Sequence, residues 1–190
     1  MSDRGRRRAG LRNLSRASGA DIQIGTNRIQ ERDDLAIVSI ATPLGGEDAL
    51  AKELKKHWSL DVPEPTRSTN SGETRAIRSG QDQMLLVFPH DTPDAEPHVQ
   101  GKLGGTGYTT DQTDSWVVLE ISGPDTMAAM ERLCPLDLVS FEVDDAGRTV
   151  MEHMGAFIVK TGDDRFLLMS ASSSAQSFLH AVETSYSYVT

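Results

Sequence analysis

The glycine-rich stretch at residues 101–107, GKLGGTG, has the composition of a phosphate-binding loop. Such a loop ends in Gly-Lys-Ser/Thr and leads into a helix, so that backbone amides and the lysine converge on phosphate. Here Lys102 comes near the start of the stretch, and the residues that follow favour a strand. A dinucleotide fingerprint must follow a strand and open a helix, which is also the reverse order. The pattern therefore argues against phosphate binding.

The histidines do not have the spacing of a metal site. They are His57, His90, His98, His153 and His180. None forms HExxH or another close pair of ligands. His90 and His98 flank an acidic loop with Asp91, Asp94 and Glu96, which can attract a metal adventitiously. A solvated loop is the commoner outcome for such a segment, so we predict no metal-binding residues.

The remaining nucleophile and cation-ligand patterns indicate structural roles. Cys134 ends a predicted helix, which is the wrong helix end for a nucleophilic thiol, so we predict a buried helix residue. The serines at 170 and 172–174 lack the Gly-x-Ser-x-Gly elbow and favour a helix cap. Asp144 and Asp145 begin a calcium-like fragment whose twelve-residue ligand series does not continue, which is typical of a turn. We therefore predict no catalytic, cofactor-binding or metal-binding residue in this chain.

Composition narrows the class of protein further. The 190 residues include 28 acids and 19 Lys+Arg, for a net charge of -9, which argues against nucleic-acid binding because phosphates need cations opposite them. No apolar run approaches the roughly 20 residues of a membrane-spanning helix. The single cysteine excludes an intrachain disulfide and a cysteine cage for zinc or iron–sulfur, and it fits the reducing cytoplasm.

The charge is concentrated at the N-terminus. The arginines of this segment are Arg4, Arg6, Arg7, Arg8, Arg12 and Arg16. The segment carries about +5 and the remainder about -14. Its low apolar content predicts a disordered basic arm, which we place at residues 1–29, and we expect the segment from Arg4 to Arg16 to be dispensable for folding. A plain tail, a tail that docks on an acidic partner, a nucleic-acid tail and an Arg-rich targeting peptide remain open as its role.

Two halves of similar plan follow the arm. The first half has an apolar strand at 35–40, a helix at 47–58, a loop at 66–72 and a hairpin of 75–78 with 84–88. The second half has strands at 116–121, 149–151, 156–160 and 166–169, a helix opened by Pro124, and a last helix with Phe178 and Val182.

The halves align at an offset of about 80 residues, the length of a small domain. LAIVSI aligns with WVVLEI, and the turn GQDQ before MLLVF aligns with GDDR before FLLM. We predict an α+β protein with two pseudo-repeated βαββα lobes, at 30–108 and 109–190, and mainly antiparallel sheets.

Several blocks of the second half, in this order and spacing, resemble the gamma subunit of heterotetrameric sarcosine oxidase. They are residues 116–125 (WVVLEISGPD), 134–138 (CPLDL), 148–153 (RTVMEH), 164–169 (DRFLLM) and 173–179 (SSAQSFL). The resemblance covers about residues 30–186, less specifically in the first half, where residues 37–40 fit. Gln83 and Met84 stand where the family leads us to expect a tryptophan-bearing segment.

The resemblance implies a two-lobed relative of the folate-binding aminomethyltransferase fold of glycine cleavage. It also implies a complex of four different subunits, an oxidoreductase acting on CH-NH donors, that oxidatively demethylates sarcosine to glycine. FAD, FMN, NAD, tetrahydrofolate and zinc are then expected in the partner alpha, beta and delta subunits. The gamma chain is expected to be mainly structural and non-catalytic alone.

Two alternatives remain open, a subunit of an N-methylglutamate dehydrogenase-type complex and a stand-alone folate-binding module. Five Phe, three Tyr and two Trp leave few aromatic side chains for folate walls once the core is filled. An accessory subunit needs a docking face, which also allows self-association of the isolated chain. Our sequence candidates for that face are Met151, Met154, Tyr186 and Tyr188.

Overall fold

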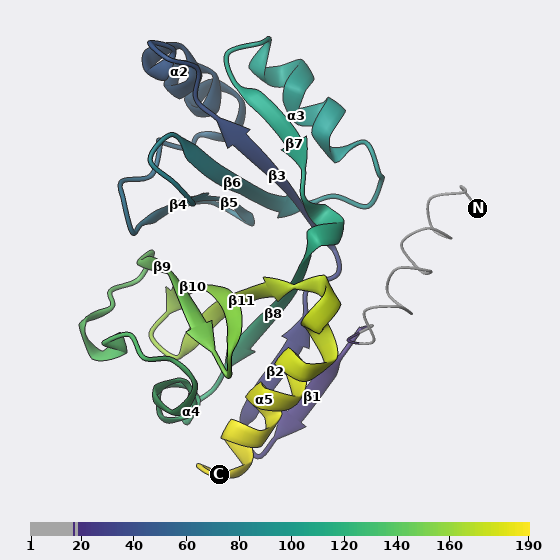
Figure 1. Ribbon diagram of the computed structural model, residues 1–190, viewed down its shortest axis with the longest axis vertical. Coiled ribbons are helices and arrows are strands. Elements are labelled where there is room, and N and C mark those ends of the chain that lie inside the picture. Colours follow the sequence, from purple (N-terminus) through teal and green to yellow (C-terminus); the bar gives the residue numbers. More distant parts are fainter. Residues whose placement is uncertain (1–16, 18) are drawn as a thin grey trace. The chain divides into compact units, whose positions relative to one another are not determined.

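The computed structural model describes Ala17 and residues 19–190 (Figure 1). The chain divides into two compact units. The first lobe is the continuous segment Asp34–Thr113, and the second lobe combines the described residues up to Asp33 with Asp114–Thr190. Within the part of the chain described, no helix combines the length and the apolar character that crossing a bilayer requires.

The first lobe is an antiparallel five-stranded sheet with two helices. In chain order its elements are β3 (Leu35–Ala41), α2 (Glu47–Trp58), β4 (Ser68–Ser71), β5 (Thr74–Arg78), β6 (Gln83–Pro89), α3 (Ala95–Leu103) and β7 (Tyr108–Asp111). The strand order in the sheet is β4-β5-β6-β3-β7. In α2, Leu50 and Leu54 are four residues apart and buried, while Glu47 in the first turn and Lys55 in the last complement the helix dipole.

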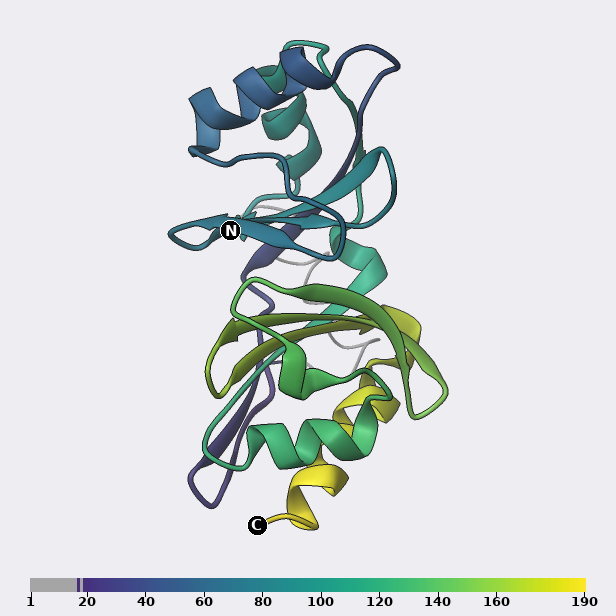
Figure 2. The same ribbon diagram turned by 90° about the vertical axis from the view of Figure 1, so that its left-hand side faces the viewer.

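The second lobe has a six-stranded antiparallel sheet and two helices on one side of it (Figure 2). Its elements are β1 (Asp21–Ile24), β2 (Asn27–Glu31), β8 (Trp116–Ser122), α4 (Thr126–Leu133), β9 (Ala146–Met151), β10 (Met154–Gly162), β11 (Arg165–Ala171) and α5 (Ala175–Ser187). Short 3₁₀ turns lie at Thr113–Ser115, Leu138–Ser140 and Ser172–Ser174. The strand order is β1-β2-β8-β11-β10-β9.

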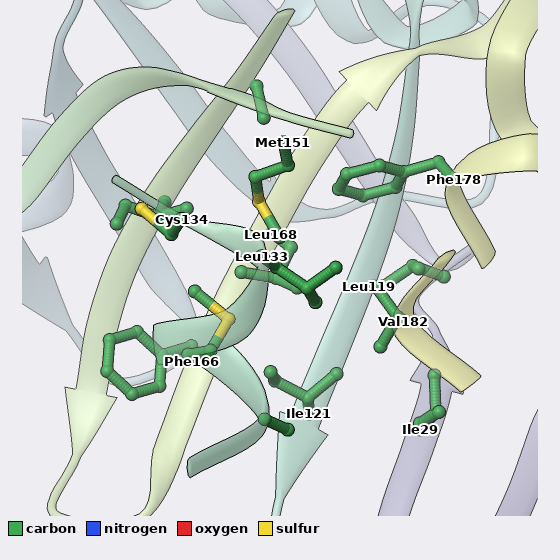
Figure 3. Close-up of a cluster of buried hydrophobic side chains, with 14 of the residues drawn as sticks. Ile29, Leu119, Ile121, Leu133, Cys134, Met151, Phe166, Leu168, Phe178 and Val182 are labelled. Carbon is green, nitrogen blue, oxygen red and sulfur yellow. The ribbon is translucent and has the colours of Figure 1, made fainter. Parts of the chain in front are cut away.

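Alternate residues of the second-lobe strands form its core with the two helices. Leu119 and Ile121 of β8 and Phe166 of β11 point into a cluster that also contains Phe178 and Val182 of α5 (Figure 3). The period of two in strands brings these apolar positions onto one face of the sheet. The first lobe has its own cluster, built on the same principle from its strands, α2 and α3.

The predicted fold class and the pseudo-repeat are confirmed. The order β3-α2-β4-β5-β6-α3 is repeated as β8-α4-β9-β10-β11-α5, and the sheet segment β4-β5-β6-β3 corresponds to β9-β10-β11-β8. The repeat unit is therefore βαβββα, one strand longer than the predicted βαββα. The prediction of a loop at 66–72 was wrong at Ser68–Ser71, because this polar segment pairs with β5 as β4.

The predicted arm over residues 1–29 was wrong for its described part, because Ala17 is buried in the core of the second lobe and strands begin at Asp21. Residues 1–16 and 18, which include the arginines, lie outside the described residues. Asp21–Ile24 and Asn27–Glu31 are β1 and β2, and β2 pairs with β8 of the second lobe. The predicted boundaries at 30 and 109 also shift, because the first lobe begins at Asp34 and keeps β7 through Thr113.

Buried Asn27 fixes the N-terminal hairpin to the start of α4. Its Nδ2 donates to Asp125 Oδ2 at 2.8 Å and its Oδ1 accepts from the Asp125 backbone N–H at 3.0 Å. Asn27 is 1% exposed, so both bonds form where water is absent. A buried amide with both ends satisfied specifies one arrangement of the elements that it joins.

The hairpin turn between β9 and β10 is strained. Glu152 and His153 have φ of 46° and 67°, a region that non-glycine residues enter at a cost. We expect the double replacement Glu152→Asn and His153→Gly to raise the free energy of unfolding by about 1 kcal/mol, because Asn-Gly suits this turn. Urea unfolding measures the change.

The β10–β11 turn supplies a control for that experiment. Asp163 and Asp164 have no positive φ, so Asp163→Asn with Asp164→Gly should bring no gain. Equal effects of the two double variants would contradict a strain-based explanation.

Candidate functional site

The glycine-rich stretch connects a helix to a strand, in the order predicted from the sequence. Gly101 and Lys102 lie in the last turn of α3, Gly104 is the residue that ends it, and β7 begins at Tyr108. The end of a helix carries partial negative charge, which disfavours phosphate. Gly107 is buried, and a Cβ there would lie 2.9 Å from Ile40 Cγ2, so this stretch serves close packing.

The histidines of the acidic loop lie together in the first lobe. His90 Nε2 is 2.9 Å from Asp94 Oδ1 and 3.0 Å from Thr92 Oγ1. The rings of His90 and His98 have centroids 5.3 Å apart. The hydrogen bond from Thr92, together with the one to His90, lowers the pKa of Asp94 to about 2. Desolvation lowers the pKa of His98, and the charges of Lys102 and His90 act in the same direction.

The pair formed by His90 and His98 does not include His153 or His180. His153 is in the β9–β10 turn and His180 is on α5, both in the second lobe. In the described parts of the chain, no three His, Cys, Asp or Glu side chains gather closely enough to hold a metal ion.

The lowered pKa values predict a pH dependence of stability. Because the unfolded chain binds a proton at His98 more readily, stability should fall as the pH decreases through the ordinary His range near 6.5. The Asp94 carboxylate contributes to stability above pH 3.8, and this contribution is lost as the pH falls toward 2. We expect His98→Gln to reduce the fall in the free energy of unfolding between pH 7.5 and 5, measured by urea unfolding. Lys102→Met should weaken the decline without removing it, and equal slopes for the wild type and His98→Gln would refute this assignment.

The nucleophile and ligand candidates occupy structural positions. Cys134 directly follows α4 and is 5% exposed, with its Sγ 3.8 Å from Thr149 Oγ1. Ser174 occupies the N-cap position of α5, as predicted, although its side chain makes no capping hydrogen bond. The Asp145 carboxylate accepts from the Glu142 backbone N–H at 2.7 Å, which makes this segment a turn.

The four proposed docking residues differ in exposure. Met151 and Tyr186 are 1% and 0% exposed, so the sequence interpretation of these two was wrong. The Tyr186 hydroxyl lies 2.7 Å from Thr126 Oγ1, which satisfies it inside the core. Met154 is half-buried, and Tyr188 is exposed beneath the guanidinium of Arg132, 4.7 Å from the ring centroid.

A mostly apolar hollow of about 670 Å³ lies at one end of the second-lobe sheet. Its lining includes Trp116, Pro135, Arg148, Val150, Phe157 and Ala171. The register of the strands explains its shape, because Trp116 lies opposite Ala171 and Gly155 lies opposite Val150. The two small residues form a floor between the larger side chains, and open space surrounds the position of a Cβ on Gly155. The volume is within the usual range for binding pockets.

Arg148 is the charged residue of this hollow. Its guanidinium lies 4.7 Å from the centroid of the Phe157 ring, a cation–π contact that orients it. Three other second-lobe arginines have acidic partners: Arg28 is paired with Asp21, and Arg32 and Arg165 are paired with Glu120. Among the described residues Arg148 has no acidic partner. Sequence reasoning missed this site because its residues meet only through the strand register.

Comparison with solved structures shows which known proteins have a similar two-lobed fold. One chain of the heterotetrameric sarcosine oxidase from Corynebacterium sp. U-96, in complex with pyrrole 2-carboxylate, matches with a TM-score of 0.77 and 21% identity. The match covers 93% of each chain. The glycine cleavage system aminomethyltransferase T from Bartonella henselae matches with a TM-score of 0.61 and 12% identity, over 90% of this chain and 48% of that one. At these identities the likeness establishes the fold.

Sequence comparison adds a partial match. No family model matches the chain. Ribosomal RNA large subunit methyltransferase H from Marinomonas sp. (strain MWYL1) is 34% identical in an alignment 89 residues long, and the match covers 42% of this chain and 57% of that protein. The chain therefore spans little more than half the length of this curated relative.

Proposed function

We propose that this chain is the gamma-type, mainly structural subunit of a heterotetrameric sarcosine oxidase, an enzyme complex that oxidatively demethylates sarcosine to glycine. The observation that carries the proposal is the fold match over 93% of both chains. The match to the aminomethyltransferase, by contrast, covers only 48% of that chain, as expected when the shared fold is one part of a larger protein. The ordered sequence blocks of the second half support the same assignment.

In this assignment the chemistry belongs to the alpha, beta and delta subunits, which would carry FAD, FMN, NAD, tetrahydrofolate and zinc in the cytoplasm. Flavin and dinucleotide phosphates bind free amides at a helix start. At the start of α4, the Asp125 N–H is already bonded to Asn27 Oδ1. This contact supports a scaffolding role for that end of the second lobe.

Co-expression with the three presumed partner subunits tests the proposal. We expect the chain to co-purify with them in one complex that produces peroxide when sarcosine is added. The chain purified alone should be colourless in the visible range and inactive with sarcosine. A yellow, active preparation of the isolated chain would refute the accessory role, as would failure to enter the complex.

Two further measurements address the alternatives. A complex that oxidises N-methylglutamate in preference to sarcosine would assign the chain to an N-methylglutamate dehydrogenase-type assembly. Equilibrium dialysis of the isolated chain with tetrahydrofolate tests the stand-alone folate module, and we expect no saturable binding.

A further inference from the structure

The hollow in the second lobe lies beside an exposed strand edge. β9 is the last strand of the sheet, and its backbone pairs with β10 alone among the described residues. An edge strand presents backbone N–H and C=O groups that another extended segment can bond. Arg148 and Val150 project from this strand on the face of the hollow, and Val150 is 53% exposed.

The charge of the hollow indicates what can approach it. The chain has a net charge of -9, yet this lining contains no acidic side chain and one cation, Arg148. Stacking on Phe157 holds that cation in place before a partner binds. Tryptophan and arginine at a partly apolar depression are the side chains that contribute most to protein–protein binding.

We propose that an extended segment of a partner subunit adds to the outer edge of β9 and fills this hollow. It places a carboxylate opposite Arg148 and an apolar side chain opposite Val150, over the floor formed by Gly155. Since Arg148 and Val150 are two residues apart on one face of the strand, the segment carries an acidic and an apolar residue separated by one residue. This inference rests on the proposed function, because it names a contact within that complex.

Variants of the hollow in the co-expressed complex test the contact. Arg148→Glu reverses the charge, and Gly155→Leu adds a side chain at the floor, where a Cβ would meet no atom within 4 Å. We expect each to weaken association with the partner subunits by about tenfold or more, while Arg148→Lys keeps most of the affinity. Arg132→Glu is the matched control, because Arg132 also lies 4.7 Å from an aromatic ring and is on α4 instead of β9.

The outcomes separate the two proposals. Loss of affinity with Arg148→Glu and Gly155→Leu, but not with Arg132→Glu, supports the contact at β9. Normal assembly of both hollow variants overturns it and leaves the subunit assignment intact. Equal losses for Arg148→Glu and Arg132→Glu also overturn it, since they indicate a general charge effect. If the wild-type chain does not assemble, the proposed function fails, and this inference fails with it. Unchanged melting temperatures of the isolated variants exclude misfolding as the cause.

Discussion

Replacing Gly123 by alanine should lower the free energy of unfolding by about 3 kcal/mol or more. Gly123 has φ of 129°, a backbone conformation that residues with a side chain rarely adopt. A Cβ there would lie 2.4 Å from Asn27 Oδ1 and 2.7 Å from Asn27 Cα. The second atom is backbone, so relief of the clash requires the N-terminal hairpin to move away from α4.

Gly101→Ala is the matched control for this substitution. Gly101 lies within α3, has open space where a Cβ would be, and should gain about 0.5–1 kcal/mol from alanine. Urea unfolding of both variants gives the comparison. Similar small changes in the two would contradict the close packing of Gly123 against Asn27.

Removal of residues 1–31 should unfold the second lobe, whereas removal of residues 1–16 should leave its melting temperature nearly unchanged. The longer deletion takes away β2, including fully buried Ile29 and the Asn27 contacts with Asp125. Loss of one such apolar side chain alone costs about 2–5 kcal/mol, a large part of the stability of a small domain. The shorter deletion tests the prediction that the arginines at 4–16 are dispensable.

Each lobe contains one of the two tryptophans, which lets fluorescence follow the lobes separately. With Trp58→Phe in the first lobe, Trp116 reports on the second lobe. We expect the 1–31 deletion to abolish the cooperative Trp116 transition. A normal transition in that deletion variant would show that β1 and β2 contribute little, and a large loss in the 1–16 deletion would show that the arm is required.

Elements with strong local signals could be predicted from the sequence. The β-branched run at 35–40 and the apolar run at 116–121 became β3 and β8, because buried strands need little more than apolar residues bounded by turns. β1 and β2 were missed although Ile22, Ile24 and Ile29 carry a signal. Their polar neighbours and nearby arginines resembled a tail, and the partner strand β8 lies some 90 residues further on.

The hollow could not be predicted for a related reason. Its floor depends on Ala171 and Gly155 lying in one row between Trp116 and Val150, and only the register of four strands sets that row. The prediction was wrong for Met151 and Tyr186, two of the four docking candidates, because side-chain type does not show in which direction a side chain points. Tyr186 has a polar hydroxyl, but Thr126 satisfies it inside the core.

Assembly of the second lobe from two separate segments affects how the chain folds during synthesis. β2 leaves the ribosome before the first lobe, and its partner β8 follows after it, on the order of ten seconds later at usual translation rates. The first lobe is continuous, so all of its strands and helices are synthesised within that interval. Its own β3 and β7 lie side by side, with Val38 opposite Asp111, so a folded first lobe holds its two ends together. The long loop between β2 and β8 is then already closed, and the entropy of closing it no longer opposes the last strand pairing. In this order of events, the first lobe acts as a folding aid to the second within one polypeptide.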